Sequence, residues 1–210
     1  MYTLYGKKGS GSASIEAALT MAAAPYRLVE TASWETNDAF RELLKINPIG
    51  QIPTLALPDG GALSESAAIL IHLDAAHPAA GLLPRDEAPR AQAIRGLVYI
   101  AANCYSAITV IDFPERFCSD MDDSARDRIR AGTRARLHHH WEIFADMFPA
   151  RPFLAGADIG ALDLYAAVVT KWAGSRAHLA EHRAPFHAAL LKIEAHPKVA
   201  AVFSRNWPAK

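Results

Sequence analysis

The sequence has little of several features that would point to a partner or a compartment. Its 22 basic and 22 acidic side chains leave no net charge, and they form no basic block. Nucleic-acid-binding surfaces carry a marked positive excess, so we expect no nucleic acid as a partner. No apolar run approaches the ~20 residues of a membrane helix. The first residues also lack a basic region followed by an apolar stretch, so we expect a cytoplasmic location and no membrane contact.

Metal ligands in a usable pattern are also scarce. Cys104 and Cys118 lie fourteen positions apart without a C-x-x-C spacing, which fits neither a zinc site nor a dithiol redox pair. The "HHH" run at 138–140 falls in a helical pattern, where consecutive side chains point to different faces and cannot hold one ion. We therefore expect no metal site.

What the sequence does contain is an alternating first part and a purely helical second part. Strand-like and helix-like runs alternate up to residue 46, a hairpin is predicted around Asp59-Gly60-Gly61, and a helix follows from Ser66. Residues 79–89 hold proline and glycine without periodicity and are predicted to be a linker. Helical spacing then recurs over 90–113, 124–148, 162–173 and 185–195. The predicted class is α+β: a βαβ-α-ββα domain at 1–78, and an all-helical domain at 90–210.

The stretch "GKKGSGSAS" between the first strand and the first helix has three possible interpretations. Gly9, Gly11 and Ser14 nearly spell the dinucleotide pattern G-x-G-x-x-G, with Glu30 near the spacing of a ribose-binding acid. The helical second half argues against that fold, because it supplies no further βαβ unit. The simplest alternative is a turn in which Ser12 caps the helix. The third is an anion site at the helix N-terminus.

The segment "NPIGQIPTL", residues 47–55, is the most informative in the chain. Pro53 stands directly before a strand, where its missing N–H would waste a ladder bond unless the chain turns there. A cis peptide between Ile52 and Pro53 would make that turn. The "LSES" run at 63–66 then opens the next helix with free N–H groups and hydroxyl donors, which suit a carboxylate.

These segments, together with "SESAAIL" and "RPFLAGADIGALDLYAA", resemble the cytosolic glutathione transferases over essentially the whole chain. The resemblance is to the serine- or tyrosine-type enzymes, since Gly11 replaces the cysteine of the bacterial beta class. It implies a thioredoxin-like first domain, a helical second domain and a homodimer. It also implies glutathione as co-substrate and a small electrophilic molecule as the second substrate.

The resemblance also assigns roles along the chain. The backbone of Ile52, next to Pro53, would pair with the cysteinyl unit of glutathione. Glu65 and Ser66 would bind the γ-glutamyl amine and carboxylate, as expected of an acidic acceptor and a donor at a helix N-terminus. Gln51 is a weaker candidate for the same site.

Activation of the glutathione thiol requires one well-placed donor, and the chain offers three. A loop serine can point at the sulfur without strain, so Ser10 ranks first. Ser12 ranks second because capping would occupy its hydroxyl. Tyr5 ranks third, since an aromatic side chain near the end of a central strand more often packs in the core.

The acceptor pocket is harder to predict. Asn103, Tyr105 and Ser106 occupy the region of the first long helix that faces the acceptor in relatives, and they make it polar and uncharged. Trp141, Trp172 and Trp207 are expected in the core or an interface. Isomerisation, dehalogenation or ether cleavage on the same fold, or a non-catalytic interaction module, remain alternatives to conjugation.

The start of the last resembling segment departs from the family pattern. Gly160 stands where relatives carry serine or threonine as N-cap, and Asp163 is retained three residues on. We expect Asp163 to belong to a buried capping network, so that its loss damages folding more than chemistry. In the first helix, Glu16 stands where many relatives carry arginine.

Overall fold

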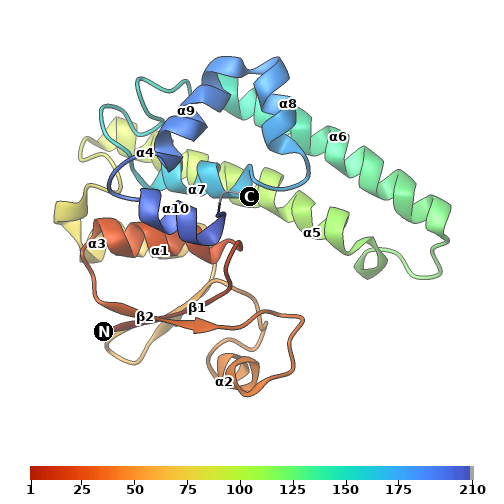
Figure 1. Ribbon diagram of the computed structural model, residues 1–210, viewed down its shortest axis with the longest axis horizontal. Helices are drawn as coiled ribbons and strands as arrows, with labels where there is room; N and C mark the ends of the chain where they lie inside the picture. The colour runs from red at the N-terminus through yellow and green to blue at the C-terminus, as the bar shows by residue number, and fades with distance from the viewer. Residues whose placement is uncertain (209–210) are drawn as a thin grey trace.

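The computed structural model describes residues 1–208 and places a small mixed sheet beneath a bundle of helices (Figure 1). The strands are β1 (Tyr2–Gly6), β2 (Tyr26–Glu30), β3 (Thr54–Ala56) and β4 (Ala62–Leu63). Their order in the sheet is β2-β1-β3-β4, with β1 and β2 parallel and both other pairings antiparallel. Together with the helices between them, they make the predicted thioredoxin-like arrangement βαβ-α-ββα.

Three helices cover the two faces of this sheet. The helices α1 (Ser12–Met21) and α3 (Ser66–Ala76) lie on the face toward the bundle, and α2 (Asp38–Ile46) lies on the opposite face (Figure 1). The sequence offers Asn37 or Asp38 as the cap of α2, and the structure has Asn37, whose side chain accepts from the backbone N–H of Phe40. The helix α1 is rich in alanine and packs against β1, α3, α7 and α10, which makes it the central element between sheet and bundle.

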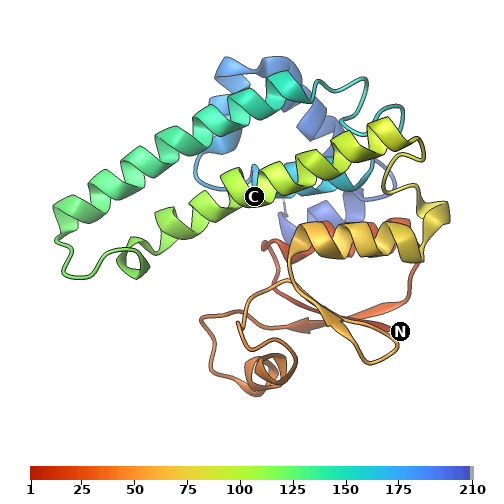
Figure 2. The ribbon, with the colours of Figure 1, turned by 180° about the vertical axis from the view of Figure 1, so that it is seen from behind.

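The rest of the described chain is helical. Its α-helices are α4 (Glu87–Tyr99), α5 (Ser106–Asp112), α6 (Asp123–Met147), α7 (Ala161–Val169), α8 (Ser175–His182), α9 (Ala184–Glu194) and α10 (Ala200–Asn206). Figure 2 shows α6 running beside α5, and α7 lies buried along its whole length at the centre of the bundle. The predicted class, α+β with a helical second half, is therefore confirmed.

The structure differs from the predicted elements in four places. The first long helix begins at Glu87, inside the predicted linker, and a π-helical segment (Ile100–Tyr105) interrupts it. The helices α8 and α10 were not predicted. The run 87–112 is long and apolar enough to cross a membrane, contrary to the expectation from the sequence, but it packs against α6 and α7 and 33% of its apolar window is buried.

The start of α7 confirms the expected capping network. Gly160 is the N-cap, and the Asp163 carboxylate accepts backbone N–H bonds from Gly160 (3.0 Å), Leu154 (2.7 Å) and Ala155 (3.0 Å). Burial raises the pKa of Asp163 to about 6, although these donors favour its charged form. A Cβ at position 160 would lie 2.7 Å from the carbonyl oxygen of Leu82, which explains glycine at this cap.

Candidate functional site

The loop between β1 and α1 holds the Ser10 hydroxyl by several short-range contacts. Ser10 Oγ accepts from the backbone N–H groups of Lys7 and Ser12, each at 3.3 Å, and lies 2.8 Å from Ser12 Oγ. Gly9 has a φ of +73°, a conformation that glycine adopts without strain. Two N–H donors on its oxygen polarise the Ser10 hydroxyl and so make it a better donor.

Ser12 does not cap α1, contrary to the simplest interpretation of the sequence. Gly11 is the N-cap and forms no side-chain bond, while Ser12 is the first helical residue. Ser12 Oγ donates to the carbonyl oxygen of Lys7 (3.2 Å) and is buried. Since a hydroxyl has one hydrogen, the oxygen of Ser12 accepts in its contact with Ser10. The Ser10 hydrogen then points to Ser12 Oγ, and because Ser10 lines the cavity whereas Ser12 does not, it is the hydrogen that would leave this contact to donate to a ligand.

Tyr5 lies away from this loop, within the sheet. It stands opposite Thr54 of β3 and Val29 of β2, and its side chain is 7% exposed. Side chains alternate along a strand, so Tyr5 points to the face opposite Leu4, which belongs to the main core.

A cavity of about 720 Å³ opens between the sheet domain and the bundle. Its lining includes the predicted residues Ser10, Gln51, Ile52, Pro53, Glu65, Ser66, Tyr105 and Ser106. Within residues 1–208, the predicted residues Tyr5, Ser12 and Asn103 are not part of this lining. The cavity thus brings together eight predicted side chains from segments far apart in the sequence.

The segment before β3 is held from beneath by Asn47. Asn47 Nδ2 donates to Thr54 Oγ1 (2.8 Å) and to the carbonyl oxygen of Gln51 (3.2 Å), and Thr54 Oγ1 donates to that carbonyl as well (2.8 Å). The peptide between Ile52 and Pro53 is cis, as the sequence predicts. Gln51 to Pro53 therefore form a fixed wall of the cavity.

Glu65 and Ser66 stand at the N-terminus of α3. Glu65 has a φ of +66°, a left-handed conformation that costs a residue other than glycine about 1–3 kcal/mol. Such conformations gather at ligand sites because the surrounding structure must hold them in place. Ser66 is 5% exposed and begins the helix, where backbone N–H groups lack partners within the helix.

On the bundle side, Tyr105 reaches the loop that carries Ser10. Its ring stacks on Trp172 with centroids 5.6 Å apart and meets Tyr165 edge-on at 6.1 Å. Burial, with added repulsion from Glu65 and Asp112, raises the pKa of Tyr105 to about 12. The phenol is therefore protonated at neutral pH and can donate a hydrogen bond into the cavity.

The other two predicted acceptor residues are engaged with their own helix. Asn103 Nδ2 donates to the carbonyl oxygen of Tyr99 (3.2 Å), and Ser106 Oγ donates to that of Ala102 (2.6 Å). Ser106 still lines the cavity, whereas Asn103 points along the π-helical segment. Of the three, Tyr105 is the one whose polar atom faces the loop.

Comparison with known proteins identifies the family. Residues 4–81 match the model of the glutathione S-transferase N-terminal domain. Over 211 aligned positions the chain is 30% identical to the uncharacterized GST-like protein YncG of Escherichia coli (strain K12), with 98% of each chain covered. The chain belongs to the glutathione S-transferase family.

Solved structures of the glutathione S-transferase family share the fold. A glutathione transferase homologue from Sulfitobacter, with bound glutathione, matches with a TM-score of 0.83 at 26% identity over 96% of each chain. A glutathione S-transferase from Methylobacterium radiotolerans, in complex with glutathione sulfonate, matches with a TM-score of 0.77 at 27% identity over 96% of this chain and 94% of that one. The resemblance inferred from the sequence motifs is confirmed.

Several cavity residues of this transferase-family chain were not predicted. Trp172 was expected in the core or an interface, but it lines the cavity beside Tyr105. Trp34 is 63% exposed at the cavity wall, and Arg116 stacks on Phe113 at 4.0 Å from the ring centroid. Their placement depends on how the two halves of the transferase fold pack, and nothing in their local sequence indicates it.

The two cysteines of the transferase-family chain lie outside the cavity lining described for residues 1–208. Cys104 is fully buried, and that burial raises the pKa of its thiol, so it stays protonated. No group of three or more candidate metal ligands gathers in that part of the chain.

Proposed function

We propose that the protein binds glutathione in this cavity, ionises its thiol with the Ser10 hydroxyl, and lets the thiolate attack a small electrophile. The observation that carries the proposal is the Ser10 hydroxyl itself. It is polarised by two backbone N–H groups, and Ser10 lines a cavity whose lining also includes Glu65 and Ser66. The glutathione bound to the Sulfitobacter homologue supports the same ligand here.

The energies required are within reach of one hydroxyl. Lowering a thiol pKa from ~8.5 to ~6.5 takes about 2.7 kcal/mol of preference for the thiolate. A hydrogen bond to a charged group supplies about 1.5–3 kcal/mol, and the N-terminus of α1 adds about 0.3–1 kcal/mol. Ser10 is favoured over Tyr5, which faces the other side of the sheet, and over Ser12, whose hydrogen goes to Lys7.

The chemistry of the cavity walls supports a direction for the bound tripeptide. The carboxylate of Glu65 would accept from the γ-glutamyl ammonium, and Ser66 would donate to the γ-glutamyl carboxylate. The backbone of Ile52 would pair with the cysteinyl unit beside Pro53, with Gln51 at the edge. This direction brings the sulfur toward Ser10.

The electrophile would enter from the bundle side. Tyr105 and Trp172 offer an aromatic wall, and the protonated Tyr105 hydroxyl offers a donor to a polar group of the acceptor. Ser106 lies further along the same wall. Asn103 has no contact with the acceptor in this proposal, because its side-chain amide donates to the carbonyl oxygen of Tyr99.

The proposal extends to the whole molecule. The division into a glutathione-binding domain at 1–78, a linker at 79–89 and an acceptor domain at 90–210 belongs to it, with the difference that α4 already begins at Glu87. So do a homodimer and a role in detoxification, which family membership supports, and a cytoplasmic location. Light scattering in solution tests the dimer directly.

Calorimetry with glutathione and ultraviolet titration of the bound thiolate test the central claim. We expect the wild type to bind glutathione, and Ser10→Ala to bind it similarly while the thiol pKa returns toward ~8.5. The loss of about 2.7 kcal/mol corresponds to a roughly hundredfold lower kcat for conjugation with an activated aryl chloride. Tyr5→Phe serves as the matched control, because it also removes one hydroxyl but leaves the loop intact.

Three other outcomes would contradict the proposal in different ways. No binding at millimolar glutathione would favour a non-catalytic interaction module. Unchanged thiol ionisation in Ser10→Ala would move the role to Ser12 or Tyr5. Binding and ionisation without conjugation of any electrophile would favour isomerisation, dehalogenation or ether cleavage at the same site.

A further inference from the structure

The helix α10 lies along α1, and its residue Asn206 contacts both α1 and the loop that carries Ser10. Asn206 Oδ1 accepts from the backbone N–H of Gly9 (3.0 Å), and Asn206 Nδ2 donates to Glu16 Oε2 (3.0 Å). The side chain is 6% exposed. Turning the amide over would set its NH₂ against the N–H of Gly9 and its oxygen against a carboxylate, so only one orientation satisfies both partners.

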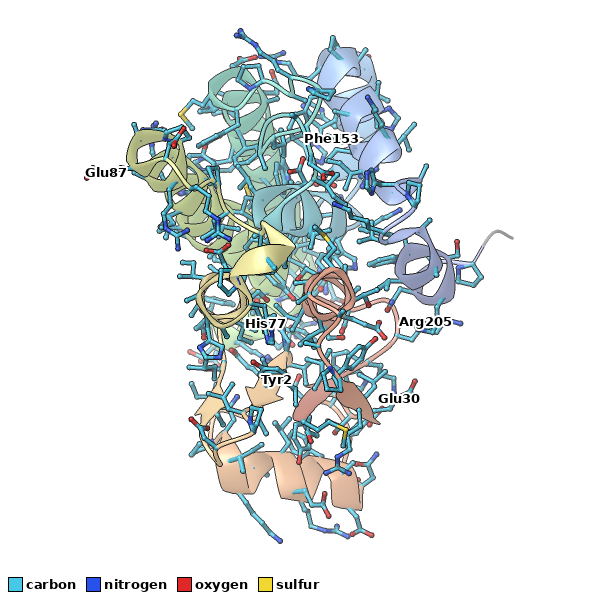
Figure 3. All side chains as sticks on the ribbon, turned by 90° about the vertical axis from the view of Figure 1, so that its left-hand side faces the viewer. Tyr2, Glu30, His77, Glu87, Phe153 and Arg205 are labelled. Atoms are coloured by element: carbon cyan, nitrogen blue, oxygen red, sulfur yellow. The ribbon has the colours of Figure 1, made fainter. Side chains whose placement is uncertain are left out.

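Glu16 is the buried anchor of this contact. It is 5% exposed and receives donors from three side chains: Asn206, Arg205 and the hydroxyl of Tyr26, which lies 3.0 Å from Glu16 Oε1. A buried carboxylate without such partners would be strongly unfavourable. Figure 3 shows Arg205 on α10, which lies beside α1. Glu16 stands where many relatives carry arginine. The positive charge that pairs with it comes from Arg205 on α10.

The contact acts on the loop directly next to the proposed thiol donor. Gly9 precedes Ser10 and has a φ of +73°, and the loop turns where the N–H of Ser10 donates to the carbonyl oxygen of Lys7 (3.1 Å). Trp207 lies on the same side of the loop as Asn206 and stacks on Phe203, with centroids 5.9 Å apart. Holding the N–H of Gly9 therefore limits where the Ser10 hydroxyl can point.

We propose that Asn206 is a positioning residue for thiol activation. It fixes Gly9, and through Gly9 the Ser10 hydroxyl, while Glu16 fixes Asn206. The proposal rests on the proposed function, because it assumes that Ser10 ionises bound glutathione. By this proposal α10 contributes to thiol activation by holding the loop between β1 and α1 in place.

Four variants test it. In Asn206→Ala the Gly9 N–H loses its acceptor. In Asn206→Asp the Gly9 N–H keeps an acceptor, but the second oxygen of the aspartate faces the Glu16 carboxylate. The double variant Glu16→Gln with Asn206→Asp keeps the acceptor for Gly9 and reverses the polarity of the bond between residues 16 and 206, since the amide of Gln would donate to Asp while its oxygen accepts from Arg205 and Tyr26. The bond from Asn206 Nδ2 to the carbonyl oxygen of Val202 (3.0 Å) is lost in all three of these variants, so it does not distinguish them. Ser204→Ala, on an exposed position of the same helix, is the matched control.

We expect the two single variants to bind glutathione with nearly wild-type affinity but to raise the pKa of its bound thiol and lower kcat by about tenfold, the effect of one hydrogen bond. Amide hydrogen exchange at Gly9 should rise in parallel. The double variant should recover the thiol pKa and kcat, and Ser204→Ala should change neither. If Asn206→Ala proves unstable, Asn206→Asp and its rescue by Glu16→Gln give the same test.

A wild-type thiol pKa and kcat in both single variants would overturn the role of Asn206 while leaving the role of Ser10 intact. Failure of the double variant to recover the thiol pKa, with its fold preserved, would also count against the proposal. If instead the wild type binds no glutathione or leaves its thiol unionised, the proposed function fails first. The wild-type titration therefore separates the two failures.

Discussion

The hydroxyl of Tyr105 occupies the space in which a side chain at Gly11 would begin. A Cβ built at Gly11 would lie 2.2 Å from Tyr105 Oη, with the ring carbons Cζ and Cε1 at 3.1 and 3.3 Å. The bundle thus contacts the proposed thiol-activating loop through one phenol. Glycine is required at position 11 by this close approach, since the backbone there is helical and sterically ordinary.

This contact predicts the effect of Gly11→Ala. The added methyl would push Tyr105 or the loop aside, so we expect a kcat lowered by about tenfold or more and a loss of about 1–3 kcal/mol in the free energy of unfolding. Adding Tyr105→Phe removes the closest atom and should recover part of the stability. Urea unfolding and conjugation kinetics measure both. Gly132→Ala is the control, because nothing lies within 4 Å of a Cβ there. Equal effects of the two glycine substitutions would contradict the prediction.

The buried carboxylate of Asp163 predicts a large loss of stability in Asp163→Asn. The amide offers one accepting oxygen where the carboxylate offers two, and its NH₂ would face backbone N–H donors. Each donor left unsatisfied costs about 1–3 kcal/mol, so chemical denaturation should show a loss in that range or above. Asp127→Asn, on a side chain 80% exposed, should change the free energy of unfolding little. A comparable loss in the two variants would refute the burial argument.

The cap of α7 predicts that a better capping residue would be harmful. Serine caps helices better than glycine by a few tenths of a kcal/mol. At position 160, however, its Cβ would meet the Leu82 carbonyl oxygen at 2.7 Å and Ala155 Cβ at 2.9 Å. We expect Gly160→Ser to lower the free energy of unfolding by about 1–3 kcal/mol, because steric crowding exceeds the capping gain. A higher melting temperature than the wild type would show that the loop gives way instead.

A stack of histidines between α6 and α8 predicts a dependence of stability on pH. The ring of His178 stacks on His138 and lies tilted by 40° against His182, each with centroids 4.3 Å apart. His138 Nε2 bonds to the carbonyl oxygen of Ala173 (3.0 Å). Burial lowers the pKa of His138, and the nearby His178 and Arg134 lower it further. The bond to Ala173 and the charge of Glu142 act in the opposite direction and only partly offset this.

The sign follows from proton uptake. With a folded pKa below the unfolded value of ~6.5, the unfolded chain binds a proton first as the pH falls, so the contribution of His138 to stability is lost below about pH 6.5. We expect His138→Gln, which can keep a donor to Ala173, to flatten the change in the free energy of unfolding between pH 7 and 5. An unchanged slope in the variant would exclude His138 as its source. His139→Gln, on the neighbouring helical position, is the control.

Local patterns predicted much of the sheet domain. The Asn37 cap, the hairpin at Asp59-Gly60-Gly61 and the cis peptide before Pro53 each depend on a few consecutive residues. Such features follow from backbone sterics and short-range hydrogen bonds, which involve only residues close together in the sequence. They are therefore accessible without knowing what packs against them.

The parts that were missed depend on distant partners. Ser12 is a good capping residue by type, but its hydroxyl turns to Lys7 because Gly11 takes the cap position. The helix α10 is short and depends on Glu16, which lies near the opposite end of the chain. Trp172, which follows α7, lines the cavity where it stacks on Tyr105 of the π-helical segment. In each case the deciding contact is tertiary.

The π-helical segment has a consequence for how substrate preferences are compared across the family. Each residue of an α-helix advances the direction of its side chain by about 100°, so one extra residue in a turn rotates everything after it by that amount. Tyr105 ends the π segment and faces the loop, whereas Asn103, two positions earlier, does not. In a relative whose helix lacks the extra residue, a gapless alignment pairs Tyr105 with a side chain on another face. Cavity residues of this chain and its relatives therefore have to be matched by superposition rather than by position in the alignment.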